Sequence, residues 1–180
     1  MIKYHDQVWG KPVYDDRTIF EFLILESAQA GLSWETVLNK YEGYKKNFDN
    51  FDYKKVAKYD EERINKILRD PSIIRNKLKV NAAVNNAQKF LEVQKKFGSF
   101  SKYIWSFVNG KPIQNKLKNQ TDIKANTNVS DILSKDLIKR GFKFVGSTII
   151  YAHMQATGMV NDHLVDCFRY KEVQTMQQPW

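Results

Sequence analysis

The sequence predicts an all-α fold, and three observations support this prediction. Apolar residues recur with the helical period along most of the chain, and Ser or Asp precedes many of these segments, as helix-capping residues do. No segment convincingly alternates like a strand, and no internal repeat is present. With 180 residues, 42% of them hydrophobic, the chain can form one domain, or two small lobes that share a core. We expect residues 1–170 to form this domain.

The predicted helices follow in order along the chain. The first covers residues 16–30 with Asp15 or Asp16 as its cap, and because it is apolar on most faces, we expect it to be buried. The second begins after Ser33 and reaches residue 40 or beyond. Shorter helices are expected after Asp52, to residue 58, and after Asp60, to residue 68.

A long amphipathic helix is predicted over residues 74–96, where Gly98 ends it. Its expected apolar stripe consists of Leu78, Ala82, Ala83, Ala87, Phe90, Leu91 and Val93. Ser99 opens a short helix to residue 108, and residues 109–129 are expected to form a polar loop. Ser130 is the predicted cap of a helix that ends at Gly141, and a last helix continues to about residue 157. Residues 171–180 are expected to form a polar, disordered tail that ends in Pro179-Trp180.

Composition limits the class of protein and its compartment. The formal net charge is +9 and the isoelectric point is about 9.5, which favours a polyanionic partner but does not distinguish DNA, RNA, a ribosome or acidic lipid from a merely solubilising surface. No stretch has the length and apolarity of a membrane span, and no secretory signal is evident. Cys167 is the only cysteine, so an internal disulfide is excluded. We therefore expect a cytoplasmic protein without membrane contact, and a monomer.

One carboxylate stands out in the first helix. Glu26 has Phe22 and Leu23 one turn before it and Ala30 one turn after it. Because a buried ionised carboxylate is costly without a partner, Glu26 should meet a cation, accept hydrogen bonds or face a ligand pocket. A purely structural glutamate remains an equal alternative.

Two further patterns carry potential chemistry. The turn from Gly141 to Gly146 lies between two predicted helices, within an expected hairpin of residues 130–157, and glycines there permit close backbone approach to another molecule. An ordinary pair of helices would show the same pattern. His163 and Cys167 are four residues apart, which on one helical turn suits Zn²⁺, and His5 is the other candidate ligand. The alternative is a pair of buried side chains without a metal.

Four blocks in a fixed order resemble the 3-methyladenine DNA glycosylase I family, a branch of the helix-hairpin-helix DNA glycosylases. These blocks cover residues 4–10, 25–34, 133–146 and 158–167, and read YHDQVWG, LESAQAGLSW, LSKDLIKRGFKFVG and GMVNDHLVDC. The resemblance implies a helical fold in which both ends of the chain meet at a structural zinc site. It also implies an enzyme that removes 3-methyladenine from alkylated double-stranded DNA and has no lyase activity.

The resemblance assigns roles to individual residues. Glu26 falls on the carboxylate that recognises the base, Trp34 on the stacking tryptophan and Tyr4 on an aromatic residue of the pocket; core or surface aromatics are the alternatives. Leu32 is a candidate wedge for the gap left by an extruded base, although a buried leucine is the simpler interpretation. The backbone of the DNA should be held by the hairpin residues Lys139, Arg140, Gly141, Lys143, Val145 and Gly146.

The resemblance also carries a departure. His5, His163 and Cys167 match three of the family's four zinc ligands, but the fourth, an N-terminal cysteine, has no counterpart. Part of the family's pocket wall comes from the same segment, so a DNA-binding module without activity is the second hypothesis. A basic RNA- or ribosome-binding protein is the third, and it does not explain Glu26. Asp162 is expected to cap a helix rather than to act in catalysis.

Overall fold

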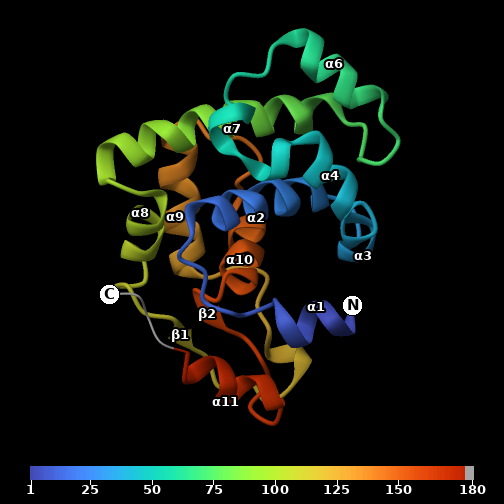
Figure 1. The fold of residues 1–180 in the computed structure, drawn as a ribbon. Helices are drawn as coiled ribbons and strands as arrows, with labels where there is room; N and C mark the ends of the chain where they lie inside the picture. The colour runs from blue at the N-terminus through green and yellow to red at the C-terminus, as the bar shows by residue number, and fades with distance from the viewer. Residues whose placement is uncertain (177–180) are drawn as a thin grey trace.

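The computed structural model describes residues 1–176, and the all-α prediction is confirmed apart from one short strand pair (Figure 1). The α-helices are α1 (Ile2–Gln7), α2 (Asp16–Gln29), α3 (Trp34–Leu38), α4 (Tyr41–Asn47), α5 (Tyr53–Val56), α6 (Glu61–Arg69), α7 (Lys77–Phe97), α8 (Phe100–Ser106), α9 (Asn128–Lys139), α10 (Ser147–Ala156) and α11 (Phe168–Gln174). The 3-10 helices are η1 (Asp49–Phe51) and η2 (Gln120–Asp122), and the strands are β1 (Ile113–Gln114) and β2 (Val160–Asn161).

Helix α2 is the centre of the molecule, as its apolar sequence predicts. Every residue from Phe22 to Ala28 is buried, so the helix has no solvent face over its last two turns. It packs between α7 on one side and α10 on the other (Figure 1). This position makes α2 the scaffold on which elements from both ends of the sequence meet.

Most predicted caps are found in the structure. Their side chains accept hydrogen bonds from backbone N–H groups in the first helical turn; these residues are Asp15, Ser33, Asp52, Asp60 and Ser99. The cap at Ser130 is wrong. Thr127 caps α9, because its hydroxyl oxygen accepts a hydrogen bond from the Ser130 N–H, and the Thr127 N–H donates to the Ser130 hydroxyl oxygen in a capping box. Ser130 is therefore the third residue of the helix.

The long helix α7 begins later than predicted, because Asn76 caps it and accepts a hydrogen bond from the Lys79 N–H. Ala82, Ala83, Ala87, Phe90 and Val93 are buried as expected, and Leu91 is half-buried. Leu78 is 72% exposed, because it lies in the first turn, at the edge of the buried stripe. The stripe therefore begins at Val80, two residues after Leu78.

The expectation that no strand forms is wrong at one place. Strands β1 and β2 pair in parallel, with Ile113 opposite Val160, and two residues in each are too few to show strand alternation. The predicted polar tail also begins too early, because α11 runs to Gln174 and buries Val173. Residues 177–180, with the Pro179-Trp180 end, lie outside the described part of the chain.

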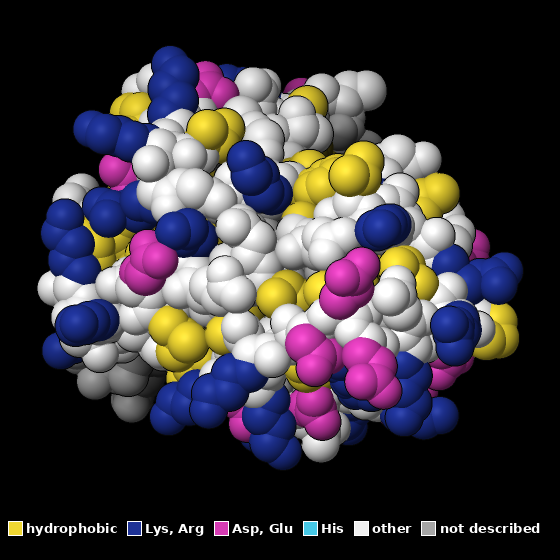
Figure 2. Space-filling model, turned by 90° about the horizontal axis from the view of Figure 1, so that it is seen from above, with side chains coloured by type: hydrophobic (Ala, Val, Ile, Leu, Met, Phe, Trp, Pro, Cys, Tyr) yellow, Lys and Arg dark blue, Asp and Glu magenta, His cyan; other side chains and the backbone are white. Residues whose placement is uncertain are grey.

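The basic charge does not gather on one face in the view from above. Figure 2 shows Lys and Arg side chains scattered there, with Asp and Glu side chains between them. None of the helices in residues 1–176 has the length and apolar character that crossing a membrane requires. The net charge alone therefore does not locate a binding surface.

Candidate active site

The carboxylate of Glu26 lacks a partner among the residues that the structure describes. The residue is 4% exposed, and no hydrogen bond or ion pair to it is formed by any group in residues 1–176. Burial raises the pKa of Glu26 to about 8. Two of the three predicted environments, a cation and hydrogen-bond donors, are thus not supplied by the described chain. The third, a ligand pocket, is the one that requires no cation or donor from residues 1–176.

A cleft of about 380 Å³ lies beside α2, a size common for small-molecule sites. Its walls come from α1, α2, α3 and the start of α4. Tyr4 and Trp34 both line the cleft, and their ring centroids are 5.4 Å apart at an interplanar angle of 47°. The structure thus brings together two aromatic residues that are 30 positions apart in the sequence.

Glu26 stands behind this cleft rather than in its lining. Burial raises the pKa of the Tyr4 hydroxyl, and the negative charges of Glu26 and then Glu21 raise it further. Tyr4 is therefore close enough to both carboxylates to be influenced electrostatically. The three residues predicted for base recognition belong to one neighbourhood.

Sequence reasoning missed four polar residues of the cleft, Lys3, Gln7, Glu21 and Tyr41. Burial raises the pKa of Glu21, against the opposing effect of a hydrogen bond with Tyr41. The available signal was a second carboxylate in the same apolar helix, with Phe22 and Leu25 on the same cleft-facing side. The cleft therefore has two acidic groups associated with it.

The predicted hairpin is present, with α9 and α10 joined by a turn at residues 140–146. Gly141 adopts φ +94°, a conformation that favours glycine, whereas Gly146 has φ −59°. A Cβ atom at Gly146 would meet nothing within 4 Å, so the start of α10 is open to a large ligand. Gly141 therefore allows the chain to reverse, whereas Gly146 leaves the start of α10 accessible.

The residues predicted to contact DNA differ in exposure. Lys139, Lys143 and Gly146 are exposed. Val145 is only 2% exposed, so its side chain anchors the turn and only its backbone can reach a ligand. Arg140 donates from Nε to Asp136 over 2.7 Å, which commits its guanidinium to the protein itself.

The proposed wedge residue lies at the surface. Leu32 is 40% exposed, so the alternative of a buried leucine is wrong. It follows Gly31, which has φ +78° and forms the sharp turn after α2. Lys79 donates to the carbonyl groups of Ala28 and Ala30 and so holds the base of this turn.

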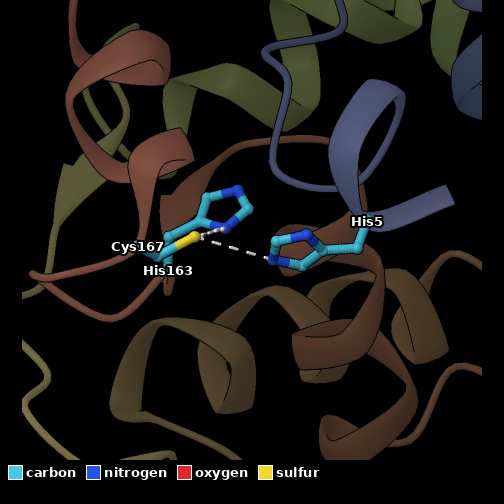
Figure 3. A group of neighbouring side chains, drawn as sticks. All are labelled: His5, His163 and Cys167. Carbon is cyan, nitrogen blue, oxygen red and sulfur yellow. Dashed lines mark hydrogen bonds between the residues drawn. The ribbon is translucent and has the colours of Figure 1, made fainter. Parts of the chain in front are cut away.

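His5, His163 and Cys167 form one cluster, in which their ligand atoms all lie within 4.8 Å of one another. The Cys167 Sγ lies 3.8 Å from His5 Nε2 and 3.9 Å from His163 Nδ1, and Figure 3 shows both rings turned toward the sulfur. The other ring nitrogens contact the Asp6 carboxylate and the Trp9 carbonyl. Sulfur and two imidazole nitrogens so oriented by outer partners fit Zn²⁺.

The local structure of the cluster differs from the prediction. The segment between β2 and α11 is not helical, and Cys167 is the residue before α11 begins. A turn, closed by the Cys167 N–H to the Leu164 carbonyl, brings the two ligands together instead. Burial first, and then His5, lower the pKa of His163 to about 4.

Asp162 does not cap a helix, contrary to the prediction. Its buried carboxylate accepts hydrogen bonds from Asn115 Nδ2, the Tyr151 hydroxyl and Gln155 Nε2 at 2.6, 2.7 and 2.8 Å. These bonds connect β2 to α10 and to the loop after β1. Asp162 therefore joins these three elements.

Comparison with known proteins places this chain and its fold in one family. The family model described as methyladenine glycosylase matches residues 1–170, and the chain belongs to this family. It is 46% identical to DNA-3-methyladenine glycosylase 1 of Escherichia coli K12 over 94% of this chain and 90% of that protein. It is 48% identical to the DNA-3-methyladenine glycosylase of Haemophilus influenzae over 92% of this chain and 90% of that protein.

Solved structures agree with this assignment. A 3-methyladenine DNA glycosylase I in complex with 3-methyladenine superposes with a TM-score of 0.91 at 40% identity, covering 93% of this chain and 90% of that chain. The glycosylase of Staphylococcus aureus, whose structure addresses 3-methyladenine recognition, gives 0.91 at 41% identity, covering 93% and 89%.

Proposed function

We propose that this protein is a monofunctional DNA glycosylase that excises 3-methyladenine from alkylated double-stranded DNA in base excision repair. The observation that carries the proposal is the aromatic cleft beside a buried, unpartnered carboxylate. The family membership and the relatives of 46–48% identity support the choice of substrate. The reaction would leave an abasic site in the DNA.

The cleft suits an extruded, cationic base. 3-Methyladenine in DNA is positively charged, and the faces of Tyr4 and Trp34 would attract this charge. The Glu26 carboxylate would attract it more strongly and accept hydrogen bonds from the adenine edge. Normal adenine lacks the charge and would gain less, which provides selection between the two bases.

The leaving group needs little help from an acid. The electron pair of the N-glycosidic bond passes to the cationic base, which departs neutral, and water adds to the sugar carbon and releases a proton. No lyase step is proposed, because none of the cleft residues is a positioned amine nucleophile; Lys3 lies at the exposed rim. The enzyme would thus accelerate the reaction mainly by binding the extruded, charged base in the cleft.

The hairpin is the proposed grip on the DNA backbone. Free N–H groups at the start of α10, next to the exposed Lys139 and Lys143, suit a phosphate of any sequence. Leu32, at the tip of the turn after α2, is the proposed wedge. Both would act on the same duplex while the cleft holds the base.

We propose that His5, His163 and Cys167 hold a structural Zn²⁺ that joins α1 to the segment before α11. The metal would stabilise this junction and take no part in the reaction. Metal analysis after exhaustive dialysis should find close to one zinc per chain, and His163→Ala should remove it. Less than a tenth of an equivalent in the unaltered protein would rule out the site.

We further propose that the protein acts as a monomer in the cytoplasm, since one chain supplies both cleft and hairpin and the bacterial relatives share its DNA substrate. A DNA-binding module without activity is the second candidate. This candidate applies if the departure from the family's pocket wall noted in the sequence prevents excision while the hairpin still binds DNA.

Release of free bases from methylated duplex DNA, read by liquid chromatography, tests the proposal. The unaltered protein should release 3-methyladenine, and Glu26→Gln should slow release by about a hundredfold, as loss of a charged contact does. Glu42→Gln, an exposed control on α4, should leave the rate unchanged. Duplex binding without any release of base would favour the second candidate.

A further inference from the structure

We propose that Asn86 of α7 is a positioning residue that holds the hairpin turn in its phosphate-binding conformation. The inference rests on the proposed function, because it assumes that the turn binds DNA. It concerns a residue that has no place in the cleft, the metal cluster or the exposed basic surface. Asn86 is 3% exposed, so it can act only through other residues.

The side chain of Asn86 binds both polar groups of one backbone residue. Its Oδ1 accepts a hydrogen bond from the Lys143 N–H at 2.8 Å, and its Nδ2 donates to the Lys143 carbonyl at 2.9 Å. Neighbouring Asn85 donates to the Gly141 carbonyl at 2.8 Å. Two bonds to a single residue fix its orientation, which one bond does not do.

The next residue of the turn needs such support. Phe144 has φ +54°, the left-handed conformation that is unfavourable for a residue with a side chain. Backbone strain of this kind persists where surrounding contacts enforce it, and it gathers at ligand sites. Asn86 holds the residue before Phe144, and the Ser27 hydroxyl donates to the Phe144 carbonyl at 3.2 Å. Two outside contacts therefore bracket the strained residue.

These contacts decide which groups face the DNA. The carbonyls of Lys143, Phe144 and Val145 all accept hydrogen bonds from side chains of the protein, the last from Ser134 at 2.6 Å. The N–H groups of residues 146–148 have no acceptor within residues 1–176. Carbonyls are thus directed inward and N–H groups are left for an anion, the arrangement of a backbone nest.

The same network relates the phosphate grip to the base cleft. Ser27 directly follows Glu26 on α2, and its hydroxyl contacts the hairpin turn. The distance between the held phosphate and the extruded base would then be set by one rigid helix. Asn86 maintains the turn in the conformation that this spacing requires.

The test compares duplex binding with binding of the free base. Asn86→Ala should bind unmodified duplex about tenfold more weakly, since the turn loses two hydrogen bonds. The slope of log affinity against log salt concentration should become less steep by about one, the contribution of one phosphate contact. Affinity for free 3-methyladenine, measured by tryptophan fluorescence, should not change. Asn47→Ala is the matched control, because Asn47 is also buried and donates to a backbone carbonyl, that of Gly43.

Each outcome is decisive. Duplex affinity equal to that of the unaltered protein would overturn the inference, and so would an equal loss of free-base affinity, which would indicate a general structural defect. If Asn86→Ala does not fold, Ser27→Ala replaces it and should weaken duplex binding about threefold with free-base affinity unchanged. No weakening in Ser27→Ala would then overturn the inference. If the unaltered protein releases no base but Asn86→Ala still loses duplex affinity, the proposed activity fails and the role of Asn86 stands.

Discussion

Replacement of His153 by phenylalanine should stabilise the protein, and the gain should be larger at pH 5 than at pH 7.5. His153 lies in α10 with no exposed surface, and neither ring nitrogen has a hydrogen-bond partner within residues 1–176. Burial lowers the pKa of this imidazole from 6.5 to about 3. The folded protein therefore holds the ring neutral at pH 5 and above.

The magnitude follows from the two pKa values. At pH 7.5 the ring is neutral in both the folded and the unfolded chain, so titration contributes nothing. Below pH 6.5 the unfolded chain takes up a proton that the folded chain does not, and stability falls by about 1.4 kcal/mol per pH unit. At pH 5 this amounts to about 2 kcal/mol of lost stability. Phenylalanine should recover it and gain about 1 kcal/mol more at both pH values by removing unpaired polar atoms, less any cost of its larger ring.

Urea unfolding at both pH values, followed by circular dichroism, measures the effect. His153→Gln is the matched control, because it keeps a polar group but does not titrate, so it should lose the pH-dependent part of the effect only. Other titrating groups cancel in the comparison with the unaltered protein. A stability difference between His153→Phe and the unaltered protein that is the same at both pH values would refute the reasoning.

Three further predictions concern separate parts of the molecule. Gly43→Ala should destabilise the fold by about 3 kcal/mol in urea unfolding, because the added Cβ would lie 2.0 Å from the Ser72 carbonyl oxygen. Gly146→Glu should weaken binding to duplexes of every sequence by about tenfold or more in fluorescence anisotropy, with the fold intact, because it adds a negative charge in open space at the proposed phosphate site. The kcat/KM for 3-methyladenine release should rise with pH to about 8, as the Glu26 carboxylate ionises, and Glu26→Gln should lack this rise.

Each of these predictions has an outcome that contradicts it. Normal stability of Gly43→Ala would mean that the backbone at Ser72 moves away at little cost. Equal weakening by Gly146→Gln would point to bulk rather than charge at the hairpin. A flat pH profile of the unaltered enzyme would show that Glu26 is already ionised when the base arrives.

Local signals predicted most of the fold, and long-range contacts account for the failures. The caps at Asp15 and Ser33 were readable because a capping side chain bonds a backbone group three residues away. The cap of α9 was misassigned to Ser130, because Ser130 and Thr127 both belong to one capping box and both are residue types that cap helices. The strand pair at Ile113 and Val160 joins segments far apart in the sequence, and a local hydrophobic pattern cannot predict such a pairing.

The same distinction holds for the candidate site. Glu26 was recognisable because a carboxylate in an apolar helix conflicts with its surroundings. The three metal-ligand candidates followed from residue type and resemblance, and the structure places them together. The hydrogen bonds of Asn86 and Asp162 were not predicted, because the sequence around an asparagine or aspartate does not show which distant group its side chain will bind.

Tyr4 and His5 are neighbours on α1, a six-residue helix in which no residue is fully buried and Tyr4 and His5 are half-buried. A helix of six residues is not stable on its own, and the position of Tyr4 therefore depends on the contacts that hold His5. The proposed binding of an ion at the His5 cluster and of a base at Tyr4 would then be thermodynamically linked, and the linkage would be reciprocal. An ion that orders α1 would strengthen base binding, and a bound base would strengthen ion binding by the same factor.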